Sequence, residues 1–128
     1  MIERLTPAGV SAPRGPYSPA VRCGDFIYVS GQVPVDPQSN KAVVGDIRQE
    51  TRQVLSNITL VLEACGATRA HVVKCQVYLT DVKDFAAMNE VYTEFFGEAK
   101  PARTTVAVAA LPLPGAKIEI DAIAYKPK

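Results

Sequence analysis

Residues 46–66 read DIRQETRQVLSNITLVLEACG, and they predict the longest helix of the chain. Asp46 can accept hydrogen bonds from the free amides of the first turn, with Gln49 three residues on as in a capping box. Gly66 can end the helix in the left-handed conformation. Apolar residues recur at the spacing of one helical face, at Ile47, Val54, Leu55, Ile58, Val61, Leu62 and Cys65. We therefore expect a helix over 46–65 that buries this one face.

The sequence on both sides of this helix predicts strands and one more helix. The second helix is expected over 84–96, with its apolar residues on one face and Gly97 as its stop. The Pro-rich segment from Pro7 to Pro19 should be extended and irregular. Alternating and β-branched residues predict strands at 20–22, 26–32, 72–80, 103–110 and 117–125.

This order of elements predicts an α+β fold, with one sheet and both helices on one of its faces. The second face of the sheet should carry a mixture of small, apolar and polar residues. Val106 and Val108, for example, alternate with Thr105, Ala107 and Ala109. Two helices cannot cover both faces of the sheet, so a neighbouring subunit is expected to cover the second face.

Size and composition indicate one globular domain over residues 1–128, since 48% of the residues are apolar and 21% are charged. The formal charge is +1 and no basic stripe is visible, which argues against a nucleic-acid-binding protein. The first residues lack a secretory signal, and no apolar run reaches membrane-spanning length. The cysteines, Cys23, Cys65 and Cys75, form no disulfide or metal pattern. These features predict a cytoplasmic protein without membrane or nucleic-acid partners.

The usual catalytic motifs are absent from the sequence. There is no Gly-rich phosphate loop, no metal-ligand cluster and no nucleophile motif, so no cofactor or metal is expected. The single histidine, His71, starts a predicted strand, where a surface position is commoner than a catalytic base. The cysteines are better explained by packing than by nucleophilic chemistry.

Two predicted strands carry polar residues that could meet. Arg103 and Thr105 share one face of their strand, and Glu119 and Asp121 share one face of the last strand. If these strands are neighbours, a guanidinium, a hydroxyl and a carboxylate converge on the side of the sheet away from the helices. An ordinary surface ion pair explains the same pattern, and the pattern alone favours that alternative.

Five segments, in this order and spacing, resemble the Rid (YjgF) family from about Tyr17 to Ala124. They are GPYSPA at 15–20, VSGQVP at 29–34, DFAAMN at 84–89, PARTTV at 101–106 and KIEIDAIA at 117–124. Any one of these segments is weak evidence, whereas the five together are specific.

The resemblance implies a chorismate-mutase-like fold and a homotrimer, in which sheets form a central barrel and active sites lie in clefts between subunits. It implies hydrolysis of reactive enamines and imines, such as 2-aminoacrylate, 2-iminopropanoate and 2-iminobutanoate, to 2-keto acids and ammonia. Arg103 matches the family's carboxylate-binding arginine. The positions that match residues lining the family's cleft are Tyr17, Ser30, Gly31, Asn89 and Glu119.

Thr105 departs from the family, because many members have a cysteine two residues after the arginine. A thiol therefore cannot be essential here, although a hydroxyl can hydrogen-bond substrate or water. We hypothesise that Glu119 orients or deprotonates the attacking water, with a structural Arg–Glu pair as the alternative. Rival functions are an endoribonuclease or translation inhibitor, a ligand-binding or chaperone-like trimer, and a deaminase for a specialised substrate such as 2-aminomuconate.

Overall fold

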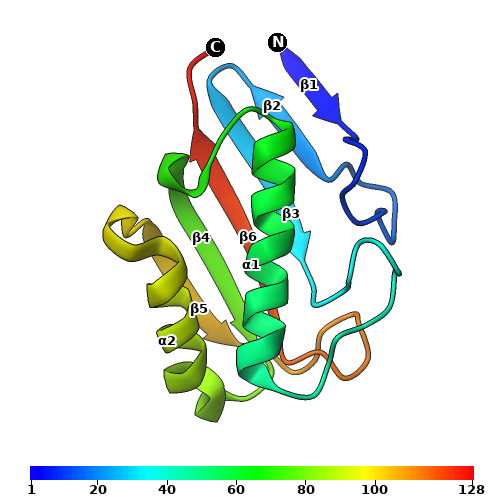
Figure 1. Ribbon diagram of the computed structural model, residues 1–128, viewed down its shortest axis with the longest axis vertical. Coiled ribbons are helices and arrows are strands. Elements are labelled where there is room, and N and C mark those ends of the chain that lie inside the picture. Colours follow the sequence, from blue (N-terminus) through cyan, green and yellow to red (C-terminus); the bar gives the residue numbers. More distant parts are fainter.

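The computed structural model describes residues 1–128 and has a six-stranded sheet with two helices on one face (Figure 1). The helices are α1, Ile47–Ala64, and α2, Phe85–Phe96. The strands are β1 (Ile2–Leu5), β2 (Ala20–Cys23), β3 (Phe26–Gln32), β4 (Val72–Leu79), β5 (Ala102–Ala107) and β6 (Ile118–Tyr125). Short 3-10 turns precede β4 and flank α2. The predicted α+β class and both predicted helices are confirmed.

The strand order in the sheet is β1-β2-β3-β6-β4-β5. Only β4 and β5 run parallel, and α2 connects them; all other neighbouring pairs are antiparallel. The C-terminal strand β6 therefore lies in the middle of the sheet, between β3 and β4. The last two strands are not neighbours, because β4 separates β5 from β6, so the condition for a convergence of Arg103, Thr105 and Glu119 on one face is not met.

The helix α1 is built as its sequence predicts. Its N-cap residue Asp46 accepts a hydrogen bond from the amide of Gln49 at 3.3 Å, although Gln49 does not return the bond of a capping box. Gly66, with a φ of 81°, follows the helix in the left-handed conformation. The apolar stripe of α1 packs with α2 on the inner face of the sheet, where 22 buried residues form the core.

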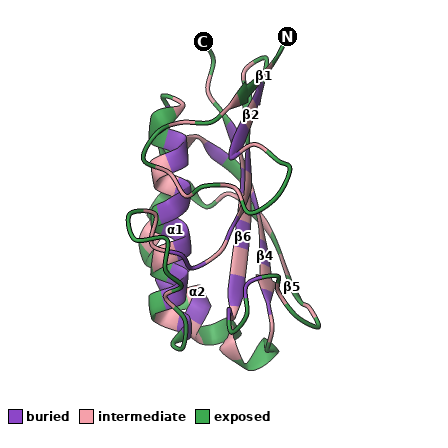
Figure 2. Cartoon of the chain, turned by 90° about the vertical axis from the view of Figure 1, so that its right-hand side faces the viewer, coloured by how far each residue is buried: buried purple, intermediate pink, exposed green.

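The other face of the sheet carries no helix or strand of this chain, as Figure 2 shows in edge-on view. Exposed apolar and aromatic side chains lie on it, including Phe26, Tyr28, Val106 and Tyr125. Phe26 and Tyr125 face each other across β3 and β6, with ring centroids 5.1 Å apart. We call this the open face.

The first strand, β1, was not predicted. It pairs with β2 at the edge of the sheet, and an ion pair between Glu3 and Lys128 joins the two ends of the chain. The two termini consequently lie at the same end of the molecule (Figure 1).

Two loops at the other end of the sheet are held by one buried carboxylate. Glu50 on α1 accepts hydrogen bonds from the amides of Gly45 at 2.8 Å and Lys117 at 2.7 Å. It therefore fixes the loop that leads into α1 and the loop, containing Pro112 and Pro114, that leads into β6. A buried charge is stable there because both of its oxygens are hydrogen-bonded.

Candidate active site

Arg103, at the start of β5, is held against α2 by three side chains. Its Nη1 donates to Oδ1 of Asn89 at 2.8 Å. Its Cζ lies 4.7 Å from the ring centroid of Tyr92 and 5.5 Å from that of Phe85. These three residues share one face of α2 by their spacing along the helix. Neither ion pair of the chain involves Arg103, so its positive charge has no carboxylate partner within the subunit.

Two buried hydroxyl groups near Arg103 have no hydrogen-bond partner. They belong to Thr105, two residues further along β5, and to Tyr92. Burial raises the pKa of the Cys75 thiol, which neighbours Tyr92, to about 11, so Cys75 remains a neutral thiol. We call Phe85, Asn89, Tyr92, Arg103 and Thr105 the Arg103 half-site.

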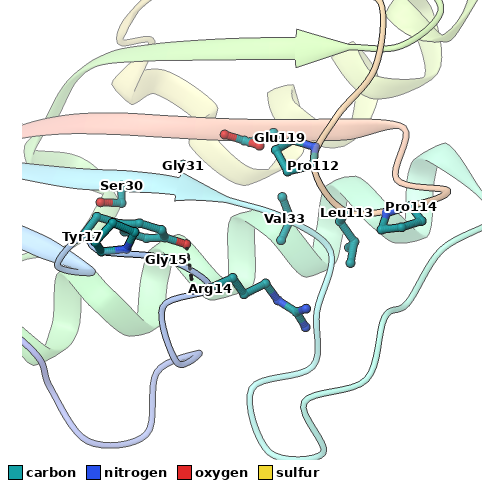
Figure 3. A pocket seen from close by; sticks show the side chains of 11 residues that line it. Arg14, Gly15, Tyr17, Ser30, Gly31, Val33, Pro112, Leu113, Pro114 and Glu119 are labelled. Carbon is teal, nitrogen blue, oxygen red and sulfur yellow. Dashed lines mark hydrogen bonds between the residues drawn. The ribbon is translucent and has the colours of Figure 1, made fainter.

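A pocket of about 620 Å³ lies elsewhere, at the ends of β3 and β6 (Figure 3). Tyr17, Ser30, Gly31 and Glu119, all predicted site residues, line it together. We call these four residues the Glu119 half-site. The rest of the lining comes from the N-terminal segment and from the two loops that Glu50 holds, and consists of Arg14, Gly15, Pro16, Val33, Pro112, Leu113 and Pro114.

The carboxylate of Glu119 lies directly against the backbone of Gly31. A Cβ atom at position 31 would collide with Oε2 of Glu119 and lie 3.0 Å from its Cδ. Any side chain at position 31 would therefore force the Glu119 carboxylate out of its present position. Burial, and then the nearby charge of Asp121, raise the pKa of Glu119 above its ordinary value.

A bulge in β3 brings Ser30 and Gly31 to this position. The register of β3 with β6 shifts between Val29 and Gln32, so two residues of β3 oppose one of β6. The hydroxyl of Ser30 donates to the carbonyl of Ser18 at 2.6 Å, which fixes the N-terminal segment beside the bulge. Within that segment the amide of Arg14 donates to the Tyr17 hydroxyl at 3.2 Å, and Tyr17 stands at the pocket wall.

The two half-sites face opposite sides of the sheet. Arg103 pairs with Cys75, which is buried beneath the helices, whereas Glu119 pairs with Tyr78 on the open face. Cross-strand partners share a face, so Arg103 and Thr105 lie on the helical side. The predicted convergence of Arg103, Thr105 and Glu119 on the open face of one subunit is therefore wrong. The predicted alternation along each strand is correct, but Arg103 and Thr105 lie on the helical face of β5 and not on its open face.

The remaining candidates lie outside both half-sites. Asp121 shares the open face with Glu119, as predicted, and accepts a hydrogen bond from the Tyr78 hydroxyl at 3.2 Å. His71 accepts a hydrogen bond from the amide of Thr68 at 3.0 Å in a capping box, which is a structural role. Cys75 is buried as expected of a packing residue, whereas Cys23 is exposed. No three His, Cys, Asp or Glu side chains gather as a metal site would require.

Sequence reasoning missed three residues of these surroundings. Phe85 and Tyr92 were recognised only as apolar positions of α2, and their spacing from Asn89 was the signal for a shared face. Arg14 was overlooked, although it is the one charged residue in the irregular segment from Pro7 to Pro19.

No helix of the chain is both long and apolar enough to cross a bilayer.

Comparison with known proteins gives one consistent result. The family model described as Endoribonuclease L-PSP matches residues 9–126. A RutC family protein of Pyrococcus horikoshii is 54% identical, covering 98% of this chain and 99% of its own. The 2-iminobutanoate/2-iminopropanoate deaminase of Capra hircus is 44% identical, covering 98% of this chain and 92% of its own.

A solved structure of Escherichia coli TdcF with bound serine superposes with a TM-score of 0.90. It is 35% identical and covers 97% of this chain and 98% of its own. Since the family model covers nearly the whole chain and the relatives match over nearly their full lengths, the chain belongs to the Rid family, also named YjgF, L-PSP or RutC.

Proposed function

We propose that this protein hydrolyses reactive imines and enamines derived from amino acids to 2-keto acids and ammonia, and that Arg103 binds the substrate carboxylate. The preferred substrates are 2-aminoacrylate, 2-iminopropanoate and 2-iminobutanoate. The observation that carries the proposal is the Arg103 guanidinium, which three side chains of α2 hold without any carboxylate partner. A fixed guanidinium with free N–H groups is suited to bind a planar carboxylate bidentately.

The named relatives support this chemistry. The goat relative is named as an imine deaminase, and TdcF was solved with serine, a ligand that carries a carboxylate beside its amino-bearing carbon. The three free cysteines fit a reducing compartment, and we propose a cytoplasmic location.

The reaction requires little covalent chemistry from the protein. An imine carbon next to a carboxylate is electrophilic; water adds to it, the C–N bond of the resulting carbinolamine breaks, and a 2-keto acid and ammonia leave. Glu119 would accept the proton of the attacking water, and its raised pKa makes it a stronger base than an ordinary glutamate. The unpartnered Thr105 hydroxyl would hydrogen-bond the substrate or the water.

Because the two half-sites lie on opposite sides of one sheet, we propose that they meet between subunits. The Arg103 half-site of one copy would face the Glu119 half-site of the next, in a homotrimer whose open faces pack around the centre. The exposed aromatic and aliphatic side chains of the open face support this burial. A ring of this kind uses each half-site once and forms closed, equivalent clefts.

The proposal is tested by generating 2-aminoacrylate in situ with a serine dehydratase and a competing amine, and measuring 2-keto acid release. Wild type should accelerate release. Arg103→Ala, shown by its circular dichroism and mass to be folded and assembled, should not. Arg103→Lys should lose at least about tenfold in kcat/KM, because an ammonium cannot form the bidentate pair, worth ~1.5–3 kcal/mol. Turnover unchanged in Arg103→Ala would refute the proposed role.

The site between subunits is tested by mixing two inactive variants. Arg103→Ala and Glu119→Gln subunits, co-expressed, should regain activity, because a cleft that takes Arg103 from one and Glu119 from the other is intact. Random assembly in equal amounts should restore roughly one cleft in four. If both variants are inactive alone and their co-assembled mixture is also inactive, the half-sites do not combine across subunits. Incubation of the same wild-type preparation with RNA tests the endoribonuclease alternative.

A further inference from the structure

Arg14 is a second arginine at the pocket, and neither the fold nor the proposed reaction accounts for it. It lines the pocket with the Glu119 half-site, and its backbone is anchored by the hydrogen bond from its amide to the Tyr17 hydroxyl at 3.2 Å. Its guanidinium takes part in neither ion pair of the chain and donates no hydrogen bond to another residue. The positive charge is therefore available to a molecule in the pocket.

Three of the residues that line the pocket with Glu119 and Arg14 are apolar: Val33, Leu113 and Pro114. In the view of Figure 3, Val33 lies between the Glu119 carboxylate and the Arg14 guanidinium, and Leu113 and Pro114 stand beside it. A molecule with its reacting carbon near Glu119 would pass this apolar wall before it reaches Arg14. An apolar wall next to a positive charge would suit a substrate whose side chain is apolar along its length and anionic at its end.

We propose that Arg14 determines substrate specificity, and that this site takes imino acids whose side chain ends in a carboxylate or another anionic group. This inference rests on the proposed imine hydrolysis. Arg103 would hold the carboxylate next to the imine carbon, Glu119 would act at that carbon, and Arg14 would pair with the distal anion. Glu119 is the only acidic residue among those that line the pocket, so one repulsive carboxylate faces such a substrate.

The test compares two imines of similar size that differ in the charge at their end. Amino-acid oxidases generate them in situ from L-glutamate and from L-norvaline, and a competing amine reports the rate of enzymatic hydrolysis. The measured quantity is the ratio of kcat/KM for the glutamate-derived imine to kcat/KM for the norvaline-derived imine. This ratio cancels any general loss of activity, because each variant acts as its own reference.

Arg14→Gln should lower this ratio about fivefold, which is the upper range for a solvent-exposed ion pair. Arg14→Lys should retain most of the ratio, because it keeps the charge. Arg52→Gln, which removes an exposed arginine on α1 away from the pocket, should leave the ratio unchanged. Added salt should lower the wild-type ratio toward that of Arg14→Gln, since screening weakens exposed pairs.

A fall smaller than about 1.4-fold in Arg14→Gln, or an equal fall in Arg52→Gln, would overturn the inference, because about 1.4-fold is the effect of the weakest exposed ion pairs that have been measured. Failure of the proposed function gives a different result. In that case wild type would hydrolyse neither imine, nor 2-aminoacrylate. If wild type hydrolyses all three substrates and the ratio is the same in wild type and Arg14→Gln, only the proposed role of Arg14 is refuted.

Discussion

Replacing Gly31 with alanine should displace the Glu119 carboxylate without altering its chemistry. The new Cβ would collide with Oε2 and lie 3.0 Å from Cδ, whereas ordinary contacts begin at 3.4 Å. The backbone of residue 31 has no positive φ, so the substitution adds no backbone strain of its own. The glutamate side chain can rotate away at a cost of ~0.5–1.5 kcal/mol, the usual penalty of an unfavourable rotamer.

The expected loss of activity is larger than the loss of stability. A catalytic group misplaced by about 1 Å can cost about 100-fold in rate, whereas ~1 kcal/mol lowers the melting temperature of a chain this size by only about 3–5 °C. Both quantities are measured on the same preparation, by 2-keto acid release from 2-aminoacrylate and by thermal unfolding. The predicted result is a folded protein with severely reduced kcat/KM.

A double-mutant cycle identifies the cause. In a Glu119→Ala background no carboxylate remains to be displaced, so Gly31→Ala should change the residual activity by less than about twofold and stability by less than ~0.5 kcal/mol. If Gly31→Ala lowers kcat/KM by the same factor in the Glu119→Ala background as in wild type, the effects of the two substitutions are independent. The contact between Gly31 and Glu119 would then have no bearing on catalysis.

Three further predictions follow from the same geometry. Tyr92→Leu should raise KM about tenfold by removing the ring beneath Arg103, whereas Tyr92→Phe, which keeps a ring, should have the KM of wild type. Equal KM values for Tyr92→Leu and wild type in steady-state kinetics would contradict this. Asp121→Asn should shift the acid limb of the kcat/KM–pH profile to lower pH, because the Asp121 charge raises the pKa of Glu119; an unmoved limb argues against Glu119 as the base. Glu50→Ala should lower stability by ~2–4 kcal/mol in urea unfolding, since two backbone amides lose their acceptor.

The helices and most strands could be predicted because their signals are local. The stripe of α1, its Asp46 cap and Gly66 all act within one element, and the structure confirms each of them. The strand β1 was missed because Ile2–Leu5 is only four residues long and places two adjacent charged residues between two apolar ones, so it lacks the alternation of a half-buried strand. Such a short segment becomes a strand through its pairing with β2, which is a tertiary interaction.

The residues of the candidate site could be named from the sequence, but their arrangement could not. The sequence pairs Arg103 with Thr105 correctly, yet alternation alone does not say which face of the sheet they take. On β5 the apolar Val106 lies on the open face, while Arg103 and Thr105 lie beneath the helices, which reverses the usual rule for a half-buried strand. The strand order adds a second obstacle, because the insertion of β6 between β3 and β4 leaves no mark in the sequence.

The ion pair between Glu3 and Lys128 has a consequence for protein engineering. Since Glu3 and Lys128 are in contact and both termini lie at the same end of the molecule, a short Gly- and Ser-rich linker could join the termini, and new ends could be opened in the exposed turn at Ser39 and Asn40. That turn belongs to neither half-site. A circularly permuted chain of this kind would keep every side chain of the proposed cleft, and would provide a different end of the molecule for attaching labels or a second protein.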